Sequence, residues 1–495
     1  MSRRITIDPV TRLEGHGRIE VFLDDQGDVE GACLQVPELR GFERFCLGRP
    51  AVEMPQITAH VCGVCPAAHH IASARALDAL YRVDPPPAAH KIRELYYNLF
   101  LLEDHALHFY YLAAPDLVLG PGAEAARRNV LGVVDRLGAD LGRRVVAARK
   151  LARDLMSGIA GRAAHPVFAL PGGVSRPLDR ALVARAREAA PVLVDFAAFT
   201  VKAFADGTLS SPEYLEMLRA DAFRLRHHSM GLVDEAGRLS FYRGEARVVD
   251  PAGRELLRFE PEDYLAHIAE HVEPWTYVKF PYLRALGWKG FAEGEESGLY
   301  RVGPLARLNA AERMATPRAQ AEADRLFSAL SRPAHQTLAF HWARLVEALQ
   351  AAEEVERLAH DPEILDTDVR RLPTERPTSG VGAVEAPRGT LFHHYETDER
   401  GLLTMVNLIV ASQHNAGPVQ ISIAKAAREV IRGGRADDRA LNVLEMAFRA
   451  YDPCNACASH ALPGEMPLEV TLRGRDGAVQ GVLARALPAE KDRPT

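Results

Sequence analysis

A chain of 495 residues with a formal net charge of −6 exceeds the usual size of one domain and gives no electrostatic case for nucleic acid. Hydrophobic residues make up 47% and charged residues 25%, which is an ordinary globular composition. Residues 402–411 come nearest to a membrane-spanning stretch. This stretch is too short to cross a bilayer and is interrupted by Thr404 and Asn407, so direct membrane insertion is not expected.

The predicted elements begin with a small sheet and continue as helices. Residues 4–20 alternate apolar and polar around a glycine turn at 15–17, and a second turn follows at 24–27, which predicts a β-meander. Helical spacing of apolar residues then covers 67–80 and 90–109, on either side of a proline break at 85–87. Further helices are predicted over 123–159 and 178–206.

The second half of the chain mixes strands and helices. Short alternating runs between two turns predict a β-rich insertion at about 232–273, and residues 317–360 predict another long helical stretch. An extended proline-rich segment follows to about Pro387, and helices are predicted near 418–432 and 437–451. The expected fold is mainly α (α+β), a long helix bundle core with small peripheral β elements, in one intertwined domain over 1–460 with an extension at 461–495.

Four of the six cysteines form two Cys-x-x-Cys pairs, Cys62 with Cys65 and Cys454 with Cys457. Each pair points two thiolates the same way, ready to share a metal. The pairs lie 389 positions apart, so they meet only if the fold joins the beginning and end of the chain. Sulfur ligands suit zinc, iron–sulfur, copper(I) or nickel, and suit magnesium and calcium poorly.

A structural zinc site is the commonest outcome for four cysteines, but its pairs usually lie about 15–20 residues apart. A buried, thiolate-rich site built from distant segments is more typical of catalysis. Cys33 and Cys46 have no such spacing and are predicted to be buried small hydrophobic residues. Few cysteines outside the pairs favour a reducing cytoplasm, and the first residues do not form an export signal.

The residues around both pairs resemble the two metal-binding signatures of [NiFe] hydrogenase large subunits. These are His60-Val-Cys-Gly-Val-Cys-Pro-Ala-Ala-His69 and Asp452-Pro-Cys-Asn-Ala-Cys-Ala-Ser-His460. Four more segments resemble that family in order: Arg12-Leu-Glu-Gly-His-Gly-Arg18, Arg40-Gly-Phe-Glu43, His165-Pro with Pro171-Gly-Gly173, and Glu385-Ala-Pro-Arg-Gly389. Six separated matches are too specific for chance, and they span essentially the whole chain.

The resemblance implies reversible cleavage of H₂ to protons and electrons at a nickel–iron centre whose iron carries carbon monoxide and cyanide. It implies that Cys62 and Cys454 are terminal nickel ligands and that Cys65 and Cys457 bridge nickel to iron. One departure is His60, at a position where the family usually has arginine. That position is near the metals and is not a ligand.

The resemblance also implies roles for residues beside the metals. Glu14 is expected to relay the proton from Cys454, although on sequence alone a solvated turn glutamate is the commoner outcome. Arg388, after Pro387 in a loop, is expected to approach the metals and bind a cyanide, and Ser412 corresponds to a second cyanide-binding position. Pro387, Arg388 and Ser412 are therefore the predicted cofactor-binding residues.

Two further predictions concern carboxylates. Asp104 is expected to pair with Arg388, and the alternative is an ordinary charge on a helix face. Glu43, the carbonyl of Leu408 and His460 resemble the ligands of a magnesium or similar divalent site, in which the histidine is the less usual ligand.

The resemblance predicts partners as well. An iron–sulfur cluster needs about four thiolates, so electrons are expected to leave through a small subunit that carries the clusters. The chain looks closest to cytoplasmic bidirectional members, NAD(P)-linked or methyl-viologen-reducing, which implies a diaphorase or other electron-transfer subunits. A maturation endopeptidase is expected to cut between His460 and Ala461.

Four alternatives remain open from the sequence. The chain could belong to a hydrogenase that feeds a heterodisulfide reductase, or to a hydrogen-sensing regulatory hydrogenase. It could also be a non-catalytic relative like the related subunit of respiratory complex I, although such relatives lack the metal cysteines. The fourth alternative is a helical protein held together by zinc.

Overall fold

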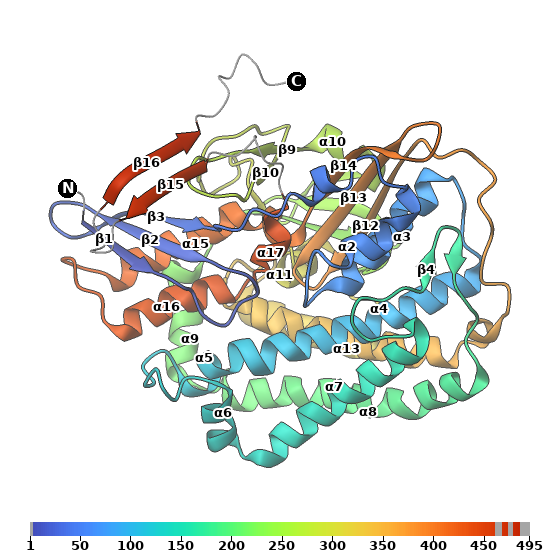
Figure 1. Ribbon diagram of the computed structural model, residues 1–495. Coiled ribbons are helices and arrows are strands. Elements are labelled where there is room, and N and C mark those ends of the chain that lie inside the picture. Colours follow the sequence, from blue (N-terminus) through green and yellow to red (C-terminus); the bar gives the residue numbers. More distant parts are fainter. Residues whose placement is uncertain (1–2, 461–467, 474–478, 486–495) are drawn as a thin grey trace.

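The computed structural model describes residues 3–460, 468–473 and 479–485. Four long helices pack side by side (Figure 1): α4 (Pro87–Leu107), α7 (Ala139–Ala160), α8 (Arg180–Gly207) and α13 (Ala339–His360). Helix α13 lies against α4 and α8, and helix α7 also packs against α4 and α8. In α4, Leu95, Leu99 and Leu102 recur at helical spacing and are buried, which explains why this segment forms a helix with an apolar face.

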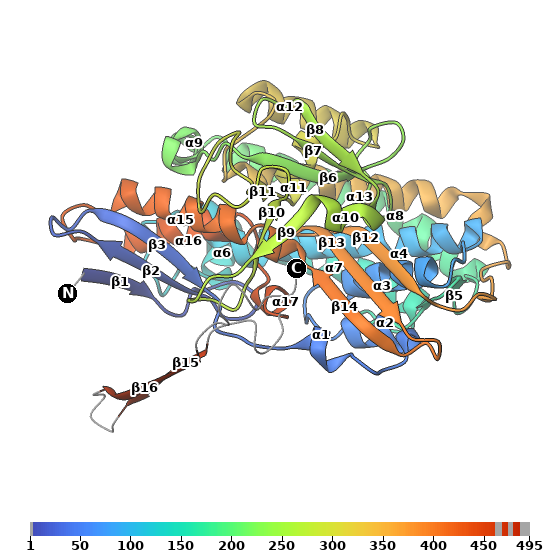
Figure 2. The same cartoon turned by 90° about the horizontal axis from the view of Figure 1, so that it is seen from above.

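The amino-terminal sheet is the predicted β-meander. Strands β1 (Arg3–Ile7), β2 (Arg18–Leu23) and β3 (Val29–Gln35) pair antiparallel in that order. Strand β3 packs against α15 (Ala416–Val430), which in turn packs against α16 (Asp438–Arg449). Figure 2 shows these first and last parts of the chain side by side, so the sequence ends converge as the cysteine spacing requires.

A second antiparallel sheet carries the segment around Arg388. It consists of β12 (Ser379–Ala386), β13 (Gly389–Thr397) and β14 (Leu403–Ile409), and it packs on α3 (Pro66–Leu80). Glycines allow this close contact: a Cβ on Gly382 would lie 2.3 Å from the Ala72 carbonyl oxygen. The prediction of a merely extended segment up to Pro387 missed β12, because a strand buried along nearly its whole length shows no alternation.

The β-rich insertion is present but larger than predicted. Its main sheet has the order β11 (Tyr300–Arg301), β6 (His228–Val233), β7 (Glu245–Val249), β8 (Glu255–Phe259). A hairpin of β9 (Ile268–His271) and β10 (Phe280–Leu283) follows. Helix α11 (Pro304–Ala310) packs against β6 and also against α13, and it therefore links the insertion to the long helices.

Two predicted long helices are broken. The stretch 123–159 contains a loop, then α6 (Val130–Leu137) and α7, which are separated at Gly138 with φ of 91°. The stretch 317–360 contains α12 (Pro317–Leu330) and α13, and Pro333 between them cannot continue a helix. The predictions near 418–432 and 437–451 correspond to α15 and α16.

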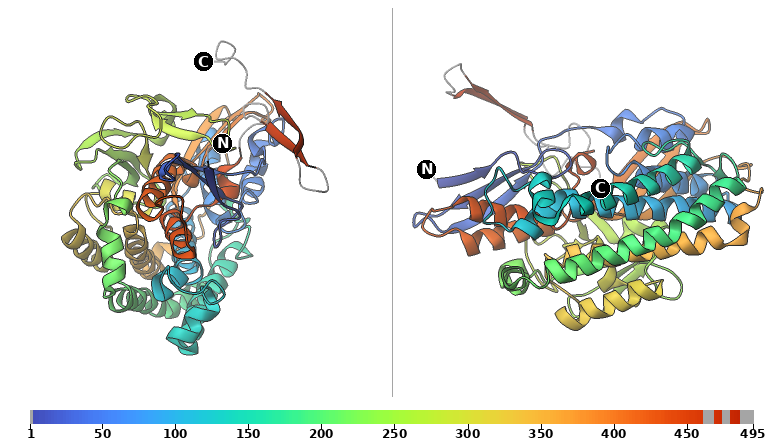
Figure 3. Two further views of the ribbon diagram at one scale, coloured as in Figure 1. Left: turned by 90° about the vertical axis from the view of Figure 1, so that its left-hand side faces the viewer. Right: turned by 90° about the horizontal axis from the view of Figure 1, so that it is seen from below.

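The remaining elements are short. The helices are α1 (Phe42–Phe45), α2 (Met54–Thr58), α5 (Ala114–Leu119), α9 (Pro212–Arg219), α10 (Tyr264–His267), α14 (Ala411–His414) and α17 (Asn455–Ala458). The strands are β4 (Ala169–Leu170), β5 (Gly173–Val174), β15 (Leu468–Arg473) and β16 (Val479–Arg485). The hairpin β15–β16 extends away from the body of the fold (Figure 3). None of the helices in the described ranges is long and apolar enough to cross a bilayer.

Candidate metal centre

The fold brings the two cysteine pairs into one buried cluster. Cys62 Sγ lies 3.4 Å from Cys454 Sγ, and Cys65 Sγ lies 3.4 Å from Cys457 Sγ. All four sulfur atoms lie within 4.8 Å of one another, and each cysteine is at most 5% exposed. Segments from opposite ends of the sequence therefore present one set of four sulfur donors.

Local backbone geometry aims these sulfur atoms. The first pair precedes α3, and Cys62 Sγ accepts the backbone N–H groups of Val64 and Cys65 at 3.2 and 3.0 Å. The second pair lies at the start of α17, and the Cys454 N–H donates to Ser412 Oγ at 2.8 Å. The predicted Ser412 is thus placed directly beside the second pair.

The Glu14 segment docks on the second pair through its backbone. The Glu14 carbonyl accepts the Asn455 N–H at 3.0 Å, and the carboxylate accepts the Ala456 N–H at 3.2 Å. Gly15 has a φ of 77°, and a Cβ there would lie 2.6 Å from the Ala456 nitrogen. This explains why glycine follows the glutamate in the motif.

The side chain of Glu14 contacts the cluster itself. Its Oε2 lies 2.9 Å from Cys454 Sγ, which donates to it. Burial, together with the charge of Cys62, raises the pKa of Glu14 above its ordinary value. A half-buried carboxyl with raised proton affinity therefore touches one sulfur of the cluster.

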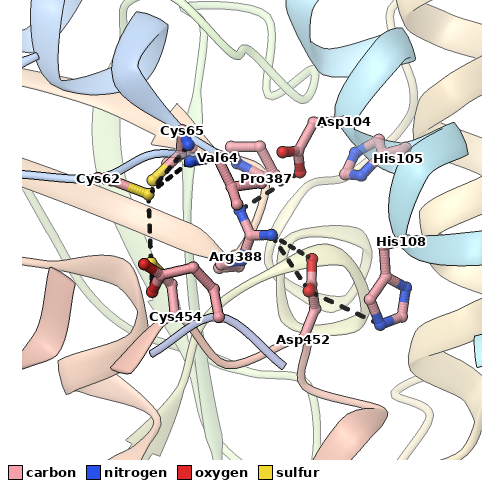
Figure 4. A network of polar contacts seen from close by, with 12 residues as sticks. Cys62, Val64, Cys65, Asp104, His105, His108, Pro387, Arg388, Asp452 and Cys454 are labelled. Atoms are coloured by element: carbon pink, nitrogen blue, oxygen red, sulfur yellow. Dashed lines mark hydrogen bonds and ion pairs between the residues drawn. The ribbon is translucent and has the colours of Figure 1, made fainter. Parts of the chain in front are cut away.

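Arg388 lies next to the cluster on the turn Pro387–Arg388 between β12 and β13 (Figure 4). Its guanidinium is 2% exposed and pairs with Asp104 at 3.3 Å and with Asp452 at 3.1 Å. Burial raises the pKa of both carboxyls, and the positive charge of Arg388 opposes this. The structure thus joins Arg388 with the predicted Asp104 and adds Asp452, to which the sequence had assigned no role.

More buried groups surround this ion-pair network. His108 Nε2 lies 3.7 Å from Asp452 Oδ1, and Arg344 Nη2 lies 4.0 Å from Asp452 Oδ2. Figure 4 shows His108 on the far side of Asp452 from Arg388. The sequence had assigned no role to His108 or Arg344. The signal that could have found them is a titratable side chain within a largely apolar helical stretch.

The three residues predicted for a divalent cation also meet. Glu43 Oε1 accepts the Leu408 backbone N–H at 2.9 Å and lies 3.4 Å from His460 Nε2. Burial raises the pKa of Glu43, but the hydrogen bond and charge of His460 outweigh it, so the pKa is lowered. Leu408 contacts Glu43 through its N–H, whereas the predicted ligand is its carbonyl.

Other sequence predictions concern residues at the edge of the site. Cys33 and Cys46 are 7% and 1% exposed, as expected for small hydrophobic residues. His60, the departure from the family pattern, is exposed and stacks on His165 with ring centroids 4.3 Å apart. His60 is therefore placed by an aromatic contact.

The four sulfur donors fit soft metal ions. Four buried thiolates would repel one another strongly unless positive charge compensated them. The guanidinium beside them is already engaged by two carboxylates. Divalent metal ions with sulfur preference supply the missing charge, whereas magnesium and calcium prefer oxygen ligands.

Comparison with known proteins identifies the family. The family described as nickel-dependent hydrogenase matches residues 40–126 and 200–460, and the HoxL-like family matches residues 4–39. The chain is 46% identical to an iron-sulfur subunit of the F420-non-reducing hydrogenase of Archaeoglobus profundus, over 96% of this chain and 98% of that protein. It is 38% identical to the NAD-reducing hydrogenase HoxS subunit beta of Cupriavidus necator, over 95% of this chain and 97% of that protein.

Solved structures agree. A crystal structure of an NAD⁺-reducing [NiFe]-hydrogenase in the H₂-reduced state matches with a TM-score of 0.84 and 39% identity, over 92% of this chain and 99% of that one. A Ni-Fe-Se hydrogenase from D. vulgaris Hildenborough matches in fold, with a TM-score of 0.73 and 22% identity, over 93% of this chain and 100% of that one. This chain therefore belongs to the nickel-dependent hydrogenase family and is the large subunit of a [NiFe] hydrogenase, as its motifs predicted.

Proposed function

We propose that this chain holds the nickel–iron centre at which the enzyme converts H₂ into two protons and two electrons, and that it also runs the reverse reaction. The observation that carries this is the buried set of four sulfur atoms within 4.8 Å, with the Glu14 carboxyl 2.9 Å from Cys454. Such a set offers both a soft metal site and an adjacent proton acceptor, the two requirements for heterolytic cleavage of H₂.

The cysteines divide into two roles in this proposal. Cys62 and Cys454 would hold nickel, and Cys65 and Cys457 would hold nickel and iron together. When bound, the metal centre supplies the heterolytic cleavage of H₂. Every later proton step belongs to side chains of this chain.

Glu14 takes the proton from the Cys454 thiol. The two groups are in hydrogen-bond contact, and the raised pKa of Glu14 brings its proton affinity closer to that of a thiol. Because Glu14 is only half-buried, it can pass the proton outward.

Arg388, with Pro387 and Ser412, binds the small ligands of the iron. Within the described part of the chain, the buried Nε of Arg388 has no hydrogen-bond partner, so a donor is available for a cyanide. Asp104 pairs with the Nη1 side of the guanidinium and fixes the direction of this donor.

Glu43, the Leu408 carbonyl and His460 are proposed to hold Mg²⁺ or a similar ion. Support comes from the 3.4 Å approach of Glu43 and His460, both buried. Binding of the cation would break the ion pair between Glu43 and His460, because the cation would replace the proton on His460.

The two electrons are proposed to leave through a small subunit with iron–sulfur clusters, in a cytoplasmic complex. NAD(P), reached through a diaphorase, is the first candidate acceptor, which the 39% identity to an NAD⁺-reducing enzyme supports. The 46% identity to part of an F420-non-reducing hydrogenase favours a second candidate, a different electron-transfer partner.

Infrared spectroscopy and metal analysis of the intact purified enzyme test the core of this proposal. We expect about one nickel and one iron at this centre and bands from iron-bound carbon monoxide and cyanide. Zinc in place of nickel, with no such bands, would overturn it. Reduction of NAD(P) by H₂ in the whole complex then separates the two acceptors.

A further inference from the structure

A fully buried arginine, Arg307 of α11, contacts the turn that carries Arg388. Its Nη1 donates to the carbonyl of Ala386 at 2.6 Å, and its Nη2 donates to the carbonyl of Pro387 at 3.2 Å. The side chain of Arg307 has no exposed surface. One guanidinium therefore holds the two peptide groups that immediately precede Arg388.

Two buried carboxylates fix Arg307 in turn. Glu347 of α13 accepts from its Nε and Nη2, both at 2.6 Å, and Glu385 of β12 accepts from Nη1 at 2.7 Å. Neither carboxylate has exposed surface. Charges buried this deeply persist only when their hydrogen bonds are well made, so the geometry of Arg307 is tightly defined.

The turn is held along its whole length. Each of the four consecutive carbonyls of residues 385–388 accepts a side-chain hydrogen bond, and the donors are Tyr97, Arg307 twice, and Asn415. Gly389 closes the turn with a φ of 143°, where a Cβ would lie 2.2 Å from a methyl carbon of Val302. Arg307 supplies the two central bonds of this series.

The same network reaches the ion-pair partner of Arg388. His105 Nε2 lies 3.1 Å from Glu347 Oε2, and His105 follows Asp104 on α4. Arg307 and Glu347 thus connect the turn that carries Arg388 with the helix that carries Asp104, which lies 3.3 Å from Arg388.

Resting on the proposed function, we propose that Arg307 is a positioning residue: it sets the place of the Arg388 guanidinium relative to the metal centre. Lysine keeps the charge, but its single ammonium cannot reproduce a bidentate contact and two carbonyl contacts together. Arg388 would then move, and a displacement of about 1 Å in such a group can cost about 100-fold in rate.

The matched control is Arg93. It is also fully buried, pairs with Asp78 at 2.5 Å and donates to the carbonyls of Leu170 and Gly173 at 2.7 and 2.8 Å. Arg93→Lys removes the same kinds of contact but leaves the Arg388 turn untouched. Comparing it with Arg307→Lys separates general loss of stability from loss of positioning.

The experiment uses the intact enzyme with its partner subunits. Both variants should unfold at lower temperature than the unmodified enzyme. Only Arg307→Lys should lower kcat for H₂ oxidation, by about 100-fold, with unchanged KM for the electron acceptor and with shifted cyanide bands in the infrared. In an Arg388→Lys background, Arg307→Lys should add less than about a twofold further loss, because coupled residues are not additive.

Three results would overturn the inference: normal cyanide bands in Arg307→Lys, an equal loss of kcat in Arg93→Lys, or full multiplication of the losses with Arg388→Lys. If Arg307→Lys does not assemble, Glu347→Gln and its control Asp78→Asn repeat the comparison with smaller changes. Absence of nickel and infrared bands from the unmodified enzyme would instead refute the proposed function.

Discussion

Glu14 acquires its chemistry from its neighbours. A glutamate between Leu13 and Gly15 is most often a solvated turn residue on sequence alone, whereas the fold half-buries it and places its carboxyl 2.9 Å from the Cys454 sulfur. The raised pKa that follows makes proton transfer from a thiol less unfavourable. Tertiary contacts thus turn what would be a solvated turn glutamate into a candidate proton acceptor.

Replacing Glu14 by Gln keeps its shape and removes its basicity. We expect Glu14→Gln to retain nickel and iron while exchange of D₂ with solvent protons falls at least about 100-fold, because general acid–base transfer is lost. Mass spectrometry of the gas phase measures this exchange. Glu20→Gln is the control, since the buried Glu20 pairs with Arg4. Normal exchange in Glu14→Gln would remove it from the relay.

The sulfur cluster makes an equally direct prediction. Cys454→Ala removes one of four sulfur donors. We therefore expect both the nickel content and the H₂-oxidation activity to fall below the detection limit. Cys46→Ala, at an equally buried cysteine outside the cluster, should keep its full nickel content. Metal analysis of both purified variants decides the matter, and turnover at the unmodified rate by Cys454→Ala would refute its ligand role.

The sequence motifs predicted side chains that meet at the site. The other contacts of the site could be recognised only from the folded structure. Glu14, Arg388 and the four cysteines each lie in a recognisable segment. Asp452 opens the second signature, yet its ion pair with Arg388 became visible only when the fold joined them. Arg307 lies in the short helix Pro304–Ala310, where no local pattern distinguishes it from a surface arginine.

At the scale of elements, the contact of α3 with β12 sets the distance between the first cysteine pair and Arg388. Cys65 immediately precedes α3, and β12 ends immediately before the turn Pro387–Arg388. Gly380 and Gly382 let the helix backbone approach the strand: Cβ atoms there would lie 2.2 and 2.3 Å from backbone atoms of α3. The two glycines therefore control the geometry of the site from a distance.

A methyl group at Gly382 should push α3 away from β12. We expect Gly382→Ala to cost about 1–3 kcal/mol in unfolding free energy, as overpacking does, and to lower nickel content with it. Gly31→Ala is the control, because Gly31 also lies in a strand and its Cβ would meet nothing within 4 Å. Thermal unfolding and metal analysis measure both effects. Equal stability of the two variants would contradict this account of the contact.

Periodicity predicted the helices better than their breaks. Amphipathic stretches such as 90–109 and 178–206 correspond to α4 and α8, since an apolar face recurs at helical spacing. The breaks at Gly138 and near Pro333 were missed because the surrounding residues keep the helical pattern. Strands β12 and β13 were missed because burial on both faces removes the alternation that marks a half-exposed strand.

At the scale of the whole molecule, the site depends on the convergence of the sequence ends. The Arg40 N–H donates to the Ser459 carbonyl at 3.1 Å, and the Gly434 N–H donates to the Gly27 carbonyl at 2.6 Å. His460 is 1% exposed, and its Nδ1 lies 2.7 Å from the Cys457 carbonyl. The carboxyl side of the second signature is therefore packed inside the fold, although 35 further residues follow it in the sequence.

The burial of His460 bears on the predicted cut between His460 and Ala461. Residues 461–467, which follow this bond, lie outside the described part of the chain. We expect the cut to follow completion of the four-cysteine site, because His460 contacts Cys457 of that site directly, at 2.7 Å from its carbonyl. We expect the large subunit from nickel-supplied cells to end at His460 and that from nickel-starved cells to continue to Thr495, as measured by intact-protein mass spectrometry. Cys454→Ala should keep residues 461–495 even with nickel present, because it cannot complete the site. An H₂-oxidising enzyme whose large subunit still ends at Thr495 would show that activity needs no cleavage.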